Sequence, residues 1–203
     1  MKLYKYFIGA FAIIVIDQII KLAVHAYMLP GMLGEIQIVG DWFKLHYTLN
    51  PGMAFGIKIM GNYGKLILSV FRLIAVTGIG YYIVHLYKNN AHPGFLWCMA
   101  LVLGGAVGNV VDSTFYGVFL DNSPVDSLTP WFHGQVIDMF YLDIWEGYLP
   151  DWLGGGYTAL WPIFNFADAS IFVGVAIIMI FQNRFFIQEE KLEETSNTVE
   201  SES

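Results

Sequence analysis

The sequence predicts an all-α membrane fold of four transmembrane helices, with a small extracytoplasmic β-structure and a long outer loop. Three observations predict it. The chain of 203 residues is 56% hydrophobic and only 13% charged, with a mean hydropathy of +0.55, whereas soluble domains carry about 25% charged residues. Four apolar stretches are long enough to cross about 30 Å of hydrocarbon. Lysine and arginine are unevenly distributed among the segments that flank these stretches.

The four predicted spans lie at about residues 7–27, 66–87, 95–111 and 163–181. The first follows two lysines, as a secretory signal does. It is too long for a signal h-region, however, and no small-residue cleavage pattern follows it, so we expect it to be retained. Residues 1–188 are predicted to form a single membrane-embedded domain. The polar, acidic residues 189–203 are predicted to be a disordered cytoplasmic tail.

The topology follows from the basic residues. Residues 113–162 contain no lysine or arginine, whereas the opposite side is flanked by Lys2, Lys5, Lys88, Arg184 and Lys191. The positive-inside rule therefore predicts that both termini are cytoplasmic and that the two long connections lie outside. Lys44 and Lys58, in the first outer connection, argue in the other direction.

Both outer connections carry structural signals. Residues 35–49 are rich in β-branched and aromatic side chains around a Gly40–Asp41 turn, which predicts a small hairpin or sheet at the membrane surface. Residues 113–162 form a long, aromatic-rich segment. A connection of this length favours an ordered or functional element over a structureless loop.

Polar residues converge at one depth of the predicted bundle. With cytoplasmic termini, Lys21 lies in the outer half of the first span and Asp17 lies nearer its middle. Asp112 ends the third span on the outside, Asp168 lies near the outer start of the fourth, and Asp138 lies in the loop between them. Charged groups in lipid are costly and mark functional sites by default. We therefore expect a site near the outer membrane interface.

The spacing of these residues supports pairing on shared helical faces. Asp17 and Lys21 are four residues apart and are expected to pair. Asn109 and Asp112 are three residues apart, as are Asn165 and Asp168. The alternative is that these groups only hold helices together by hydrogen bonds, as polar residues often do in membranes.

Glycine-rich segments also have two interpretations. The glycines of residues 104–109 (GGAVGN) favour close helix contact. In residues 50–56 (NPGMAFG), Gly52 and Gly56 either let the backbone approach a bound peptide or form a turn after a surface strand.

Other chemistries find little support. The histidines are dispersed and no H-E-x-x-H motif occurs, so no metal or other cofactor is expected. No G-x-S-x-G elbow or phosphate loop is present. Cys98 lies in an apolar run and is interpreted as a packed thiol. A net charge of −7 without a basic cluster argues against nucleic-acid binding.

Taken together, these segments resemble the lipoprotein signal peptidase (signal peptidase II) family. Five blocks carry the resemblance, in order along the chain: DQIIK at 17–21, NPGMAFG at 50–56, GGAVGNVVD at 104–112, VID at 136–138 and FNFAD at 164–168. Two positions depart from the family pattern: Ser113 replaces the usual arginine, and Met139 replaces the usual phenylalanine.

The resemblance implies a bacterial inner-membrane aspartic endopeptidase that removes signal peptides from diacylglyceryl-modified prolipoproteins, cutting before the lipidated cysteine. It implies Asp138 and Asp168 as the catalytic pair. It implies supporting or substrate-binding roles for Asp17, Lys21, Asn50, Gly52, Gly108, Asn109, Asp112 and Asn165. Expected partners are the lipidated precursors, membrane lipid and cyclic peptide inhibitors of the globomycin type.

Two close carboxylates that share a proton suit this chemistry, because one can deprotonate water while the other donates to the scissile carbonyl. The alternative function is a small ion or proton-coupled transporter, since proton relays also use intramembrane Asp and Lys. The clustering of acidic groups on one side and the absence of a visible inverted repeat argue against it. A purely structural scaffold is a third, weaker alternative.

Overall fold

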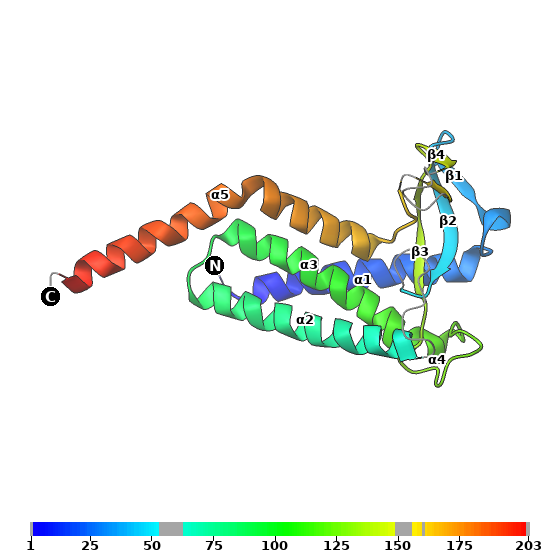
Figure 1. The fold of residues 1–203 in the computed structure, drawn as a ribbon, viewed down its shortest axis with the longest axis horizontal. Helices are drawn as coiled ribbons and strands as arrows, with labels where there is room; N and C mark the ends of the chain where they lie inside the picture. The colour runs from blue at the N-terminus through cyan, green and yellow to red at the C-terminus, as the bar shows by residue number, and fades with distance from the viewer. Residues whose placement is uncertain (1, 53–62, 149–155, 160, 202–203) are drawn as a thin grey trace. The chain divides into compact units, whose positions relative to one another are not determined.

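The computed structural model describes residues 2–52, 63–148, 156–159 and 161–201. Long helices dominate the fold, and the short strands come between them in the order of the chain (Figure 1). The chain divides into two compact units. Unit 1 comprises Met1–Val15, Phe71–Gly108 and Ala167–Ser203, and unit 2 comprises Ile16–Val70 and Asn109–Phe166.

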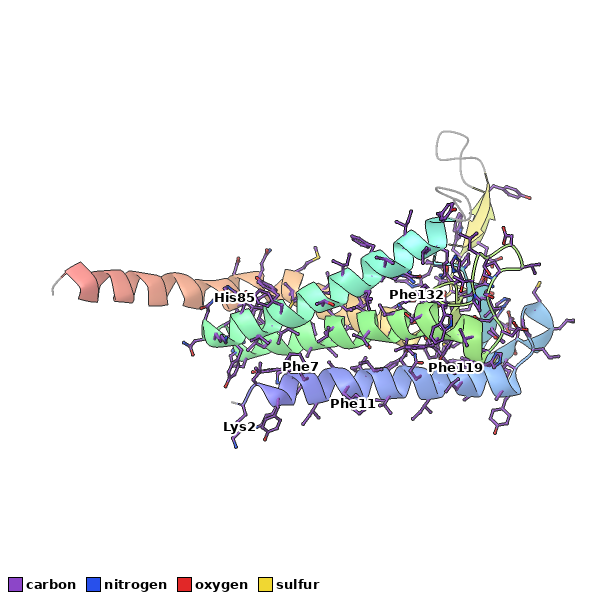
Figure 2. All side chains as sticks on the ribbon, turned by 90° about the horizontal axis from the view of Figure 1, so that it is seen from below. Lys2, Phe7, Phe11, His85, Phe119 and Phe132 are labelled. Atoms are coloured by element: carbon purple, nitrogen blue, oxygen red, sulfur yellow. The ribbon has the colours of Figure 1, made fainter. Side chains whose placement is uncertain are left out.

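Among the described residues, four helices are long and apolar enough to cross a membrane: α1 (Tyr4–Tyr27), α2 (Gly64–Lys88), α3 (Pro93–Val111, with the apolar stretch running on to Phe119) and α5 (Phe166–Ser201, apolar to Phe185). This confirms the predicted fold class. Most of the large side chains exposed on these helices are apolar, as lipid requires; Phe11, for example, is 65% exposed. Figure 2 shows Lys2 and His85 at the same end of the unit 1 helices, where the chain between α2 and α3 also turns.

Unit 1 packs around α3, and glycines allow the close contacts. A Cβ at Gly104 would lie 2.8 Å from the carbonyl oxygen of Ala10 in α1. A Cβ at Gly105 would lie 2.3 Å from the carbonyl oxygen of Ala167 in α5. The predicted interpretation of these glycines as helix-contact residues is therefore correct. Cys98 is buried in the same apolar core, as expected for a packed thiol.

Replacing Gly105 by leucine is expected to force α3 and α5 apart and to destabilise the protein by about 1–3 kcal/mol, because overpacking displaces rigid backbone. Gly78→Leu in α2 is the matched control, since nothing lies within 4 Å of a Cβ placed there. Thermal unfolding in detergent should show a lower Tm for Gly105→Leu alone. Equal melting of the two variants would contradict the packing account.

Unit 2 contains a three-stranded antiparallel sheet in the order β1-β2-β3 (Figure 1). β1 (Ile36–Val39) and β2 (Phe43–Asn50) form the predicted hairpin, and Gly40 at its turn has a φ of 51°. β3 (Val136–Leu142) pairs with β2. A separate pair joins β4 (Glu146–Tyr148) and β5 (Tyr157–Ala159). Short helical segments η1 (Met32–Gly34), η4 (Asp112–Tyr116) and α4 (Gly117–Phe119) complete the elements.

The fourth span begins later than predicted. The structure starts α5 at Phe166, not near residue 163, because Phe164 is hydrogen-bonded to Phe140 as an antiparallel bridge on the free side of β3. Asn165 therefore precedes the helix instead of lying within it. At the other end, the predicted boundary at residue 188 falls inside α5, whose Glu- and Lys-rich continuation has good helix propensity.

Candidate active site

Lys21 is the centre of a buried charged cluster in unit 2. Its Nζ lies 2.8 Å from Asp17 Oδ2, 2.7 Å from Asp112 Oδ2 and 3.0 Å from Asn109 Oδ1. The lysine and the two aspartates are each 0% exposed. An ammonium group has three donors, so these three acceptors satisfy it completely. The i,i+4 pair of Asp17 and Lys21 is thus confirmed.

Neutral groups complete this cluster. Gln18 Nε2 donates to Asp17 Oδ2 at 3.1 Å and to Asp112 Oδ1 at 2.9 Å, and its Oε1 accepts from the Tyr116 hydroxyl at 2.9 Å. Asp112 and Tyr116 bound η4, a π-helical turn. π-Helical turns are rare in proteins as a whole, but many of those that occur lie at functional sites. Here the turn carries two members of one hydrogen-bond network.

Asp138 is held at both carboxylate oxygens. Its Oδ1 accepts a hydrogen bond from Asn165 Nδ2 at 2.6 Å, and its Oδ2 accepts one from Asn50 Nδ2 at 2.8 Å. The side chain is 1% exposed. Two amide donors stabilise the carboxylate and fix its orientation. Asn50 is itself oriented, because its Oδ1 accepts from the Gly52 N–H at 2.7 Å.

The sheet explains how Asp138 reaches this position. Thr48 pairs with Asp138, and Asn50 pairs with Val136 at the end of the ladder. The register shifts between Leu45 and Thr48, and bulges of this kind re-aim side chains beside active sites. On the other side of β3, Phe164 exchanges backbone hydrogen bonds with Phe140. This anchors the chain one residue before Asn165.

A shared amide joins the two groups. Asn109 Oδ1 accepts hydrogen bonds from Lys21 Nζ and, at 3.2 Å, from Asn165 Nδ2. One continuous network therefore connects the charged cluster to the carboxylate on β3. It contains eight of the residues predicted from the sequence: Asp17, Lys21, Asn50, Gly52, Asn109, Asp112, Asp138 and Asn165.

The two other predicted residues, Gly108 and Asp168, lie close to members of this network in the sequence. Gly108 is buried in α3, one residue before Asn109. Asp168 lies in the first turn of α5, within unit 1. Gly52 has a φ of 82° and forms a turn after β2, so the turn interpretation holds for it. Gly56, in the same motif, lies outside the described residues.

The site residues predicted from the sequence did not include Gln18, Tyr116 or Phe164. Gln18 lies inside the DQIIK block. Its position as a polar neighbour of Asp17 within an apolar span could have identified it as a site residue. Tyr116 and Phe164 become evident only once η4 and β3 are formed. In the described part of the chain, no group of three or more His, Cys, Asp or Glu is placed to hold a metal ion.

Four apolar spans and a buried carboxylate–amide network define a multi-pass membrane protein with a polar site. Comparison with known proteins makes this specific. The sequence profile of a family described as signal peptidase (SPase) II matches residues 9–184. The chain therefore belongs to the signal peptidase II family, whose members are aspartic proteases, and it is a bacterial membrane peptidase.

Relatives and solved structures agree with this assignment. A lipoprotein signal peptidase of Amoebophilus asiaticus is 45% identical, covering 97% of this chain and 86% of its own length. One of Porphyromonas gingivalis is 38% identical, covering 83% and 78%. A bacterial membrane enzyme solved by the in meso method superposes with a TM-score of 0.57 at 24% identity, covering 87% of this chain and 90% of the other, which supports the fold. The transporter alternative finds no support.

Proposed function

We propose that this protein removes signal peptides from lipoprotein precursors, cutting before a cysteine that already carries diacylglycerol. The observation that carries this proposal is the buried Asp138, held at both oxygens by amide donors, in a chain whose curated relatives are lipoprotein signal peptidases. The acyl chains of such a substrate can remain in lipid while the peptide reaches a carboxylate near the membrane.

We assign catalysis to Asp138 together with Asp168. Asp168 follows Asn165, which holds Asp138, by only three residues. In unit 1 the first turn of α5 packs tightly on α3 at Gly105, which restricts where Asp168 can move. An aspartate at the start of a membrane span is costly, and such residues mark functional sites by default. These points support a pair of carboxylates sharing one proton.

Such a pair hydrolyses the peptide bond without a covalent intermediate. The charged carboxylate takes a proton from water, and the water oxygen bonds to the scissile carbonyl carbon. The protonated carboxyl donates its proton to the carbonyl oxygen. When the tetrahedral intermediate collapses, the C–N bond breaks, the cysteine nitrogen takes up a proton, and the signal peptide leaves with a carboxyl group.

The other predicted residues support this pair. Asn50 and Asn165 orient Asp138, while the Lys21 cluster with Asp17, Asn109 and Asp112 links α1 to α3 and holds Asn165 through Asn109. We assign supporting roles to Gly52, whose N–H donates to Asn50, and to Gly108, which precedes Asn109 in α3. Membrane lipid is the surrounding solvent, and cyclic peptides of the globomycin type are expected to compete with the substrate.

Lipid dependence tests the substrate assignment. The purified protein should cleave a precursor whose cysteine carries diacylglycerol and should leave the same precursor with a free cysteine essentially uncut. Mass spectrometry of both reactions locates the bond that is cut. Equal cleavage of the two precursors would contradict the assignment.

We place the protein in the bacterial inner membrane with both termini in the cytoplasm and the site on the outer side. The absence of Lys and Arg from residues 113–162 supports this. Lys44, which argued against it, is paired with Glu35 and Asp143 at 3.4 and 2.7 Å. Hydrogen bonds from His46 and Lys44 also hold the pKa of Glu35 below its usual range. The charge of Lys44 is therefore locally balanced.

Cysteine labelling tests this topology. Val125 is fully exposed, so Val125→Cys in intact spheroplasts should react with a membrane-impermeant maleimide, whereas Lys2→Cys should react only after lysis. The buried Cys98 supplies an unreactive background. Labelling of Lys2→Cys before lysis would reverse the orientation.

A further inference from the structure

The segment between α4 and β3 is closed by two amide side chains. Asn122 Nδ2 donates to the backbone carbonyl of Gln135 at 3.0 Å, and Asn122 Oδ1 accepts from the Gln135 N–H at 3.1 Å. Gln135 Nε2 in turn donates to the Asn122 carbonyl at 2.8 Å. Asn122 is buried, with 6% of its surface exposed. We call this pair the amide clamp.

The clamp lies at the end of the strand that carries Asp138. The β2–β3 ladder ends with the pairing of Asn50 and Val136. Gln135 is the next residue outward, where β2 pairs no further. The Asn122 side chain bonds to both the backbone N–H and the backbone C=O of Gln135, as a neighbouring strand would. The clamp thus extends the ladder beyond Val136 and holds the start of β3.

The same segment contacts the π-helical turn that begins at Asp112. Gly134 N donates to Ser113 O at 3.1 Å, and Phe132 N donates to Thr114 O at 3.2 Å. A Cβ at Gly134 would lie 2.2 Å from the Asp112 carbonyl oxygen. The short segment 132–135 is therefore hydrogen-bonded to the turn that follows Asp112, and it leads directly into β3, which carries Asp138.

We propose that Asn122 is a positioning residue for Asp138, acting through the backbone of Gln135; this rests on the catalytic role proposed for Asp138. Asn50 and Asn165 approach Asp138 from other elements at 2.8 and 2.6 Å. Both hydrogen bonds need β3 to stay in place. Loss of the clamp frees the strand three residues from Asp138, and a displacement of about 1 Å at a reacting group costs about 100-fold in rate.

The test compares three variants on the lipidated precursor, with kcat, KM and Tm measured for each. Asn122→Ala removes two of the three hydrogen bonds, and Gln135→Ala removes the third. Thr129→Ala is the matched control, because its Oγ1 accepts a hydrogen bond from Trp131 N at 3.3 Å, which stays within the segment. We expect kcat to fall about 10- to 100-fold in Asn122→Ala, with KM changed less than about twofold.

Gln135→Ala should lose less than Asn122→Ala and retain its Tm, so it stays informative if Asn122→Ala folds poorly. The double variant should be no slower than Asn122→Ala, because both residues act as one unit. Normal kcat in both single variants, or a raised KM with normal kcat, would overturn the positioning role. Activity in Asp138→Asn would instead overturn the catalytic role proposed for Asp138, so the two failures are distinguishable.

Discussion

Replacing Asp138 or Asp168 by asparagine is expected to abolish cleavage of a lipidated precursor, with kcat reduced about 10²- to 10⁴-fold or more, because general acid–base catalysis contributes that much. Asparagine keeps the shape of the side chain but can neither take nor give the proton. The measurement is turnover by purified variants in detergent, together with Tm on the same preparations.

Asp138→Asn should also lower the stability of the protein. Both oxygens of Asp138 accept from amides, so an asparagine there turns an N–H group toward another donor and leaves a hydrogen bond unmade. A net loss of about 1–3 kcal/mol is expected. Asp143→Asn is the control carboxylate, since it pairs with Lys44 on the sheet and should keep near-normal turnover. Near-wild-type turnover in either Asp138→Asn or Asp168→Asn would refute the catalytic pair.

Lys21→Met is expected to destabilise the protein by about 3–5 kcal/mol, because it strands two buried carboxylates. At a few degrees for each kcal/mol, the Tm in detergent should fall by about 10 °C. Lys88→Met, at the exposed end of α2, is the matched control and should melt like the wild type.

Neutralising the partners should restore stability in steps. Asp17→Asn with Lys21→Met should recover only part of the loss, because Asp112 is still a buried carboxyl group without its cation. Adding Asp112→Asn should recover more of the lost stability. Gln18, which bonds to the side chains at positions 17 and 112, is unchanged in this variant. If Lys21→Met melts normally yet is inactive, the lysine takes part in the reaction and the bracing role assigned to this cluster is wrong.

Local pattern was enough to predict much of this fold. The spans follow from apolar length, the hairpin follows from its turn and β-branched residues, and the Asp17–Lys21 pair follows from helical spacing. Non-local pairing was not predictable in the same way. Asn50 and Asp138 lie 88 residues apart in the sequence, and only the β2–β3 register brings them together. The late start of α5 likewise depends on the bridge between Phe164 and β3.

The polar network shows the same division. Asn109 was predicted to share a helical face with Asp112, but its bonds to Lys21 and Asn165 depend on tertiary structure. The π-helical turn at Asp112 has no sequence signature. The clamp joins Asn122 and Gln135, two positions within residues 113–162, for which the sequence predicted an ordered or functional element but no particular contact.

The central claim is that a pair of carboxylates directs water onto the bond before a lipidated cysteine. Its most direct test is mass spectrometry of the products formed by the wild-type protein in ¹⁸O-water that contains hydroxylamine. The account predicts one product beginning at the lipidated cysteine, and a signal peptide with a free carboxyl group that has gained one ¹⁸O atom. A signal-peptide hydroxamate, which reports an acyl-enzyme, or an uncut precursor would contradict it.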